Sequence, residues 1–138
     1  MPKVEKILVA EDSKLLRQTA ERALARAGYV VSTAVDGEEV LRAARENPPD
    51  LILLDMLLPK MSGQDALRAL KKDAATANIP VVVLTVLSRK NAEKLQSEGA
   101  FAFLEKSELA LDKGPDLLVS MLRAIIEQIP QDVAEVSG

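Results

Sequence analysis

The amino-acid sequence predicts a doubly wound α/β fold, in which a five-stranded parallel sheet carries helices on both faces. Short apolar, β-branched runs alternate five times with stretches of helical periodicity. Crossover connections between parallel strands are right-handed, which distributes the helices over both faces. We therefore expect the strand order 2-1-3-4-5, in one domain over residues 1–129 followed by a polar tail, 130–138.

The first two units each pair a strand with a helix. A strand at 6–10 precedes a helix at 13–28, in which Gly28 is the expected C′ residue. A second strand at 29–34 precedes a helix at 36–47. The residues predicted to face inward, at spacings of three and four, are Leu15, Leu16, Thr19, Ala20, Ala23, Leu24 and Ala27 in the first helix, and Val40, Leu41 and Ala44 in the second.

The other three units follow the same pattern. An apolar strand runs up to Asp55, and a turn at 59–63 leads to a helix at 64–75. Pro80 opens the fourth strand, and Ser88 is the expected N-cap of the helix after it. The fifth strand is expected at 100–105 and the last helix at 115–129, whereas 107–114 fits either a loop or one helical turn.

The composition excludes several classes of function. The chain has no Cys and no His, so thiol and Ser-His-Asp catalysis are excluded, and any metal must be held by oxygen. A net charge of −3 without a basic stripe argues against direct nucleic-acid binding, and 2% aromatic residues offer little for stacking bases. No run is long enough for a membrane span or a signal peptide, so we expect a cytoplasmic protein.

Polar side chains follow four of the five predicted strands. They are Glu11 and Asp12, Asp55, Thr85 and Lys106. The carboxyl ends of parallel strands meet at one sheet edge, where ligands bind in open α/β folds. Each residue also has a simpler explanation, such as helix capping for Asp12 or a solvated surface lysine for Lys106. Together they provide three carboxylates, a hydroxyl and an ammonium, which are the groups that would bind an oxygen-ligated divalent cation beside a phosphoryl group.

The chain resembles the receiver domains of two-component response regulators over residues 4–129. The resemblance lies in "ILVAEDS", "DLILLDMLLPKMSG", "VVVLT" and "GAFAFLEK". The second segment is the most specific, because Pro59, Met61 and Gly63 follow the aspartate at fixed offsets. The resemblance implies a phosphoprotein module of signal transduction rather than a conventional enzyme, one that catalyses only its own phosphoryl transfer and dephosphorylation.

The same resemblance implies a role for each site residue. Asp55 resembles the aspartyl-phosphate acceptor, and Mg²⁺ would be held by Glu11, Asp12, Asp55 and the backbone carbonyl of Met56. The other implied roles are a switch hydroxyl, a phosphate-binding lysine and an aromatic side chain that changes rotamer, which correspond to Thr85, Lys106 and Phe103.

The implied partners are other proteins. Because the chain has no His, the phosphoryl donor must be another molecule, which resembles a sensor histidine kinase or a histidine phosphotransfer protein. Output would pass to a partner protein, or to a homodimer, through the face of helix 4, strand 5 and helix 5. The apolar Phe101 and Ala102, at positions that are often polar in the family, support a contact surface there.

Two further departures from the family pattern concern the site. Ser107 replaces the usual proline after the lysine, so a cis peptide there would cost about 2.5–4 kcal/mol. Val86 is larger than the usual residue after the switch hydroxyl, and Leu57 and Leu87 offer no hydrogen bond to a hydrolytic water. We expect slow self-dephosphorylation from these residues.

Three alternatives have different chemistry. A pseudo-receiver that is not phosphorylated would act only as a protein-binding module, although the intact set of site residues argues against it. An Mg²⁺-dependent phosphohydrolase of the aspartyl-phosphate type would need a second aspartate where Leu57 stands. A flavodoxin-like cofactor binder shares the topology but would need aromatic residues for the ring.

Overall fold

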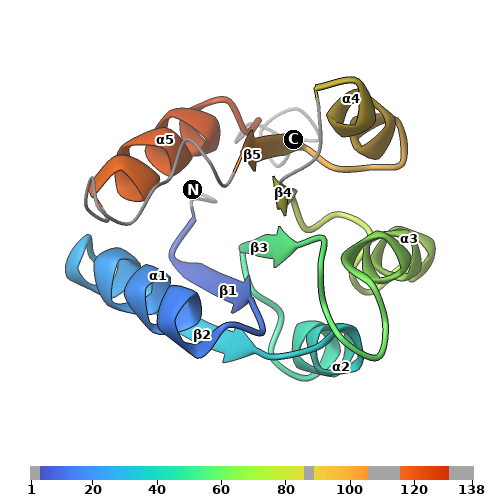
Figure 1. The fold of residues 1–138 in the computed structure, drawn as a ribbon, viewed down its shortest axis with the longest axis horizontal. Helices are drawn as coiled ribbons and strands as arrows, with labels where there is room; N and C mark the ends of the chain where they lie inside the picture. Colours follow the sequence, from blue (N-terminus) through green and yellow to red (C-terminus); the bar gives the residue numbers. More distant parts are fainter. Residues whose placement is uncertain (1–3, 86–88, 106–115, 131–138) are drawn as a thin grey trace, which may run out of the picture.

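A computed structural model describes residues 4–85, 89–105 and 116–130. Its centre is a five-stranded sheet in the order β2-β1-β3-β4-β5, and every neighbouring pair of strands is parallel (Figure 1). The predicted fold class and strand order are confirmed. The strands are β1 (Lys6–Ala10), β2 (Val30–Ala34), β3 (Leu51–Asp55), β4 (Val81–Thr85) and β5 (Ala102–Glu105).

Helices cover both faces of the sheet. α1 and α5 lie on one face, and α2, α3 and α4 lie on the other (Figure 1). This is the two-sided arrangement that right-handed crossovers produce. The helices are α1 (Lys14–Arg26), α2 (Gly37–Glu46), α3 (Gly63–Lys72), α4 (Arg89–Ser97) and α5 (Asp116–Glu127).

The sheet separates two hydrophobic cores. Successive side chains of a strand point to opposite faces, so each central strand supplies both cores. In β3, Ile52 and Leu54 pack in the core under α2, α3 and α4, whereas Leu51 and Leu53 pack in the core under α1 and α5. All four side chains are fully buried, which explains why the strand is a continuous apolar run rather than an alternating one.

The helix ends follow the expected local chemistry. The side chains of Ser13, Asp36 and Ser62 each accept a hydrogen bond from a backbone N–H in the first turn of α1, α2 and α3. Gly28, with φ of 105°, occupies the left-handed position after α1 that was predicted for it.

The prediction that Leu15 faces the core is wrong. Its side chain is 67% exposed, whereas Ala20, Ala23 and Leu24 of the same helix are buried. At roughly 100° per residue, Leu15 lies about 180° around the helix from Leu24. The spacing of three and four therefore placed the start of the buried stripe one residue too early, and the chain exposes a leucine in the first turn of α1.

Several predictions fall outside the described residues. They concern the Ser88 cap, the 107–114 segment and the tail beyond residue 130. The fifth strand begins later than predicted, at Ala102, and the last helix is described from Asp116. Within the described ranges, every helix is too short or too polar to cross a bilayer.

Candidate functional site

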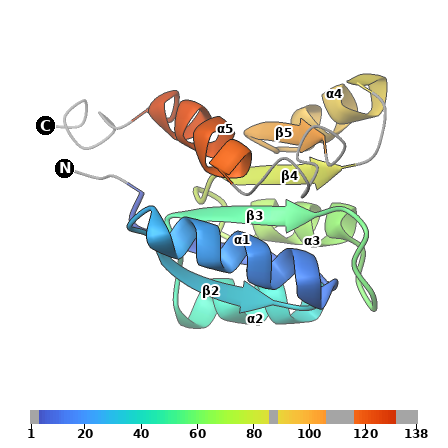
Figure 2. The ribbon, with the colours of Figure 1, turned by 60° about the vertical axis from the view of Figure 1, so that its left-hand side comes forward.

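The carboxyl edge of the sheet gathers the predicted acidic residues. All five strands point the same way, so their ends meet at one side of the molecule (Figure 2). Glu11 and Asp12 follow β1, and Asp55 ends β3. One carboxylate oxygen from each of these three residues lies within 4.8 Å of the others. The sequence prediction that they converge is confirmed.

Asp55 is part of the sheet and is shielded from solvent. It pairs in register with Leu84 of β4, and its residue is only 1% exposed. Its Oδ1 accepts a hydrogen bond of 3.0 Å from the backbone N–H of Leu57. The next residue, Met56, donates its own N–H to the carbonyl of Leu84 at 3.1 Å. Sheet pairing and the Leu57 amide therefore fix both the backbone and the rotation of the Asp55 carboxylate.

The two acids after β1 differ in exposure. Glu11 is buried and its Oε2 accepts the Ser13 N–H at 3.0 Å, whereas Asp12 is exposed. Arg17, one turn into α1, donates from Nη1 to the carbonyls of Glu11 and Asp12 at 3.0 and 3.3 Å. These contacts hold the loop between β1 and α1 through its backbone. They thus set the direction in which both carboxylates leave the chain.

The carbonyl of Met56 lies in the loop between β3 and α3, residues 56–62, called here the β3–α3 loop. This carbonyl accepts the N–H of Gly63 at 3.1 Å. A carbonyl oxygen has two lone pairs, so this bond leaves one for a further ligand. A β-carbon on Gly63 would lie 2.6 Å from the Met56 Cα and would overlap the Asp55 carbonyl oxygen. Only glycine permits this close approach of α3 to the end of β3.

The donor set fits a small hard cation. Mg²⁺ binds oxygen at 2.0–2.1 Å, so two opposite ligands of one ion lie about 4.2 Å apart. The 4.8 Å limit on the oxygens of Glu11, Asp12 and Asp55 differs from that by less than an ångström. Exposure of Asp12 leaves one side of the cluster open to water, which Mg²⁺ usually retains as a ligand. Like charges this close also favour a bound cation, which offsets their repulsion.

Thr85 and Phe103 lie on the neighbouring strands β4 and β5, and β4 lies beside the strand that carries Asp55. Thr85 ends β4 and is buried. Phe103 pairs in register with Val83, two residues before Thr85 on the same strand. Side chains alternate along a strand, so Thr85 and Phe103 belong to the same face of the sheet. Phe103 is half-buried against the core under α2, α3 and α4.

The remaining predicted site residues lie outside the described part of the chain. Lys106 and Ser107 follow β5, and Val86 and Leu87 follow β4. The position of the lysine and the geometry of its peptide bond with Ser107 therefore remain predictions. Leu57 is described, and the residue is 61% exposed.

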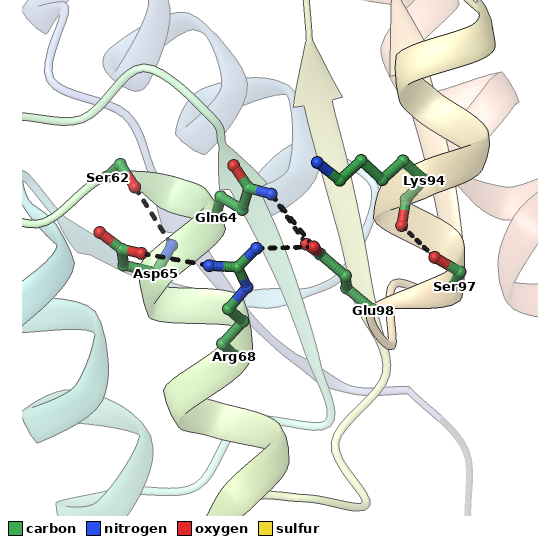
Figure 3. Close-up of polar contacts among 7 residues, drawn as sticks. All are labelled: Ser62, Gln64, Asp65, Arg68, Lys94, Ser97 and Glu98. Carbon is green, nitrogen blue, oxygen red and sulfur yellow. Dashed lines mark hydrogen bonds and ion pairs between the residues drawn. The ribbon is translucent and has the colours of Figure 1, made fainter.

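The sequence analysis missed the contacts that hold α3 and its loop in place. Gln64 and Arg68 of α3 both donate to the carboxylate of Glu98, which follows α4 (Figure 3). The Arg68 and Glu98 side chains approach to 2.8 Å. Hydrogen bonds from Arg68 and Gln64 hold the pKa of the Glu98 carboxyl below its usual value. These residues are about 30 positions apart in the chain, and no local pattern links them.

The fold and this edge define a class: a doubly wound α/β domain with an acidic, oxygen-ligand site at the carboxyl ends of its central strands. Residues 7–113 match the family model described as the response regulator receiver domain. The chain belongs to that family. Receiver domains are signalling modules rather than conventional enzymes, so the predicted family and class of function are confirmed.

Individual relatives agree with this assignment. The chain is 40% identical over 103 residues to the response regulator PleD of Caulobacter vibrioides, which covers 73% of this chain and 22% of PleD. It is 35% identical over 124 residues to the transcriptional regulatory protein PdtaR of Mycobacterium tuberculosis, covering 87% of this chain and 59% of PdtaR. Among the similar curated proteins, the matched region spans 14% to 59% of the relative's length.

Solved structures agree on the fold. The chemotaxis response regulator CheY4 of Vibrio cholerae superposes with a TM-score of 0.78 at 28% sequence identity. The match covers 89% of this chain and 99% of that one. A receiver domain of Francisella, response regulator 1452, gives a TM-score of 0.77 at 27% identity.

Proposed function

We propose that Asp55 accepts a phosphoryl group from a phosphohistidine of another protein, in an Mg²⁺-dependent reaction. The observation that carries this proposal is the burial of Asp55 within 4.8 Å of two further carboxylates, in a chain of the receiver family. A buried carboxylate among other acids is costly unless cations balance it. The proposed cation and Lys106 would provide that balance.

The transfer forms one bond and breaks another. An oxygen of the Asp55 carboxylate attacks phosphorus in line with the leaving nitrogen, the N–P bond breaks, and the donor imidazole leaves. Bound Mg²⁺, held by Glu11, Asp12, Asp55 and the Met56 carbonyl, would neutralise charge on the phosphoryl oxygens. The Leu57 N–H on Asp55 Oδ1 keeps the nucleophile from rotating, which lowers the entropy cost of reaching the reactive geometry.

The signal would pass from Thr85 to Phe103. In this proposal, the Thr85 hydroxyl donates to a phosphoryl oxygen and moves toward Asp55, and Phe103 fills the space that it leaves. Thr85 and Phe103 lie on the same face of adjacent strands, which supports such a coupled movement. Lys106 would bind the phosphoryl group, and the face of α4, β5 and α5 would contact an output protein or a second copy of the chain.

The proposed partners follow from this chemistry. The donor is a sensor histidine kinase or a histidine phosphotransfer protein, and residues 1–129 act as the receiver unit, without direct contact to nucleic acid or membrane. The module would catalyse only its own phosphoryl transfer and dephosphorylation. A pseudo-receiver that binds partners without phosphorylation is less well supported, because Glu11, Asp12 and Asp55 are all present and close together.

Phosphorylation of the chain by acetyl phosphate tests the proposal. Intact mass should rise by one phosphoryl group when Mg²⁺ is present and should not rise with a chelator. Asp55→Asn should abolish this increase, whereas Asp65→Asn, a control on the exposed surface of α3, should label like the parent. Labelling of Asp55→Asn at the parent's level would disprove the assignment of the acceptor.

A further inference from the structure

The β3–α3 loop presents a backbone group to the site, and its shape therefore matters for the chemistry. Leu57 N–H binds Asp55 Oδ1 at 3.0 Å, and the Met56 carbonyl is a proposed ligand of the cation. The loop is fixed at its ends by two backbone hydrogen bonds of 3.1 Å, from Met56 to Leu84 and from Gly63 to Met56. Neither bond determines the conformation of its middle, residues 59–61.

The middle of the loop is a strained turn. The Met61 N–H donates to the Pro59 carbonyl at 2.7 Å, which closes a three-residue γ-turn around Lys60. Lys60 has φ of 66°, the only positive φ of a non-glycine residue in the described ranges. A side chain in the left-handed region costs free energy, and such a turn persists only when its surroundings enforce it.

The first turn of α2 lies against the turn at Lys60 and restricts its conformation. Gly37 is buried, and a β-carbon there would lie 2.7 Å from the Met61 Cβ and would overlap the Met61 carbonyl oxygen. Asp36, the N-cap of α2, has a carboxylate oxygen 3.6 Å from the Lys60 ammonium. Its other oxygen accepts the Glu39 N–H at 2.8 Å, which holds the carboxylate in place. The turn therefore lies against α2 with no room for a side chain between them.

We propose that Gly37 and Asp36 are positioning residues for the phosphoacceptor. By supporting the turn at Lys60, the first turn of α2 keeps the Leu57 N–H on Asp55 Oδ1 and so fixes the rotation of the carboxylate. The proposal rests on the proposed function insofar as it concerns phosphoryl transfer. Gly37 has no side chain and lies against Met61, and the Asp36 carboxylate meets the Lys60 ammonium and the Glu39 N–H, so both residues act through the loop.

The magnitude of the effect follows from the demands of in-line attack. A displacement of about 1 Å in a reacting group can slow a reaction by about 100-fold. A methyl group at Gly37 would require a shift of Met61 of that order, because a methyl carbon in ordinary contact lies about 3.4 Å or more from its neighbours. We expect much of this shift to reach Leu57, four residues away in the same loop.

The test compares Gly37→Ala with Gly28→Ala. The second variant makes the same chemical change at the end of α1, where a β-carbon would meet nothing within 4 Å but would be strained by the φ of 105°. It therefore controls for a loss of stability that does not act through the β3–α3 loop. We expect Gly37→Ala to shift the Leu57 amide resonance, to speed its hydrogen exchange about tenfold or more, and to slow acetyl phosphate labelling by about 10- to 100-fold at saturating donor. Gly28→Ala should keep the Leu57 resonance, its exchange rate and the labelling rate of the parent.

A second variant covers the case in which Gly37→Ala does not fold. Lys60→Gly relieves the strain and removes the ammonium beside Asp36, so the protein should fold while the loop gains conformational freedom. Faster exchange of the Leu57 amide is the expected result. Parental Leu57 exchange in Lys60→Gly, and in Gly37→Ala where it folds, would overturn the proposal. A parent chain that acetyl phosphate cannot label would disprove the proposed function, while the amide measurement would still decide whether α2 holds the loop.

Discussion

Near its N-terminus, α3 and the loop before it are held by contacts of different kinds on their two sides. At the other end of α3, Arg45 of α2 and Asp73 form an ion pair of 2.7 Å. On the side of α2, the backbone of the β3–α3 loop lies directly against Gly37, where not even a methyl group would fit. On the side of α4, long side chains make the contact: Gln64 and Arg68 reach across to Glu98 (Figure 3). A backbone contact cannot adjust without moving an element, whereas rotamer changes let a side-chain contact follow a moving helix.

The two kinds of contact suit different requirements, a fixed loop on the side of α2 and movable elements on the side of α4. The side of α2 contacts the loop whose Leu57 N–H binds Asp55, where the proposed phosphoryl transfer needs a precise position. The side of α4 includes the elements expected to respond to phosphorylation, where movement is needed for output. Ion pairs between partly exposed side chains contribute little free energy, so they can rearrange at low cost.

The largest expected effect comes from breaking the other close backbone contact of this region, at Gly63, where α3 meets the end of β3. Gly63→Ala forces a β-carbon into the Asp55 carbonyl and the Met56 Cα, so we expect a loss of about 1–3 kcal/mol in unfolding free energy. Urea unfolding measures this loss, and Glu98→Ala, which removes the side-chain contacts on the side of α4, serves as the comparison. Glu98→Ala should destabilise less than Gly63→Ala. The reverse order would show that the side chains near α4, not the glycine contacts, hold α3.

A smaller effect is expected at Leu57, an exposed residue of the β3–α3 loop. Leu57→Asn places a hydrogen-bonding amide beside Asp55, where it can orient a hydrolytic water. One hydrogen bond is worth about 0.5–1.5 kcal/mol, so loss of the phosphoryl group should be roughly two- to tenfold faster. Intact mass followed after removal of the donor gives the decay rate. Leu57→Ala separates the two causes: equal acceleration in Ala and Asn variants would indicate shielding by bulk, and no acceleration in Asn would contradict the predicted role of Leu57.

The contacts of Glu98 on the side of α4 should make the stability of the protein depend on pH in the acid range. Because the pKa of the Glu98 carboxyl is lowered in the folded state by Arg68 and Gln64, its contribution to stability is full above the unfolded pKa of about 4.3. That contribution is lost as the pH falls through the lower folded pKa. Glu98→Gln should therefore lose less stability than the parent as the pH of the urea titrations falls below about 4.3. Parallel curves for parent and variant would show that the carboxylate is not held by its partners.

The smallest effect should come from the charge pair between the β3–α3 loop and the N-cap of α2. The Lys60 ammonium lies 3.6 Å from Asp36 on a side chain that is 65% exposed, so Lys60→Gln should change the unfolding free energy by less than about 1 kcal/mol. In about 1 M salt the difference should vanish, because charges are then screened within about 3 Å. A loss of several kcal/mol that persists in salt would mean that the lysine itself, rather than the glycine contact, supports the loop.

Local patterns were sufficient for the predicted sheet and for much of the site. β-branched runs separated by helical periods predict a parallel sheet with helices on both faces, and the acids after β1 and β3 meet because parallel strands share an edge. Leu15 shows the limit of periodicity, since spacing alone did not reveal where the apolar stripe of α1 stops. The support of Lys60 by Gly37 could not be predicted, because it joins residues 23 positions apart through backbone surfaces that no residue pattern encodes.

The separation of the two cores by the sheet has a consequence for how the chain tolerates change. A side chain such as Val9 packs only on the side of α1 and α5, and Leu54 packs only on the side of α2, α3 and α4. Substitutions in different cores share no neighbours, so their free energies should add, whereas substitutions within one core can compensate or aggravate each other. Volume lost beneath α1 can be recovered only from residues of that same layer. The chain can therefore drift in sequence as two nearly independent halves, joined by the hydrogen bonds of a common sheet.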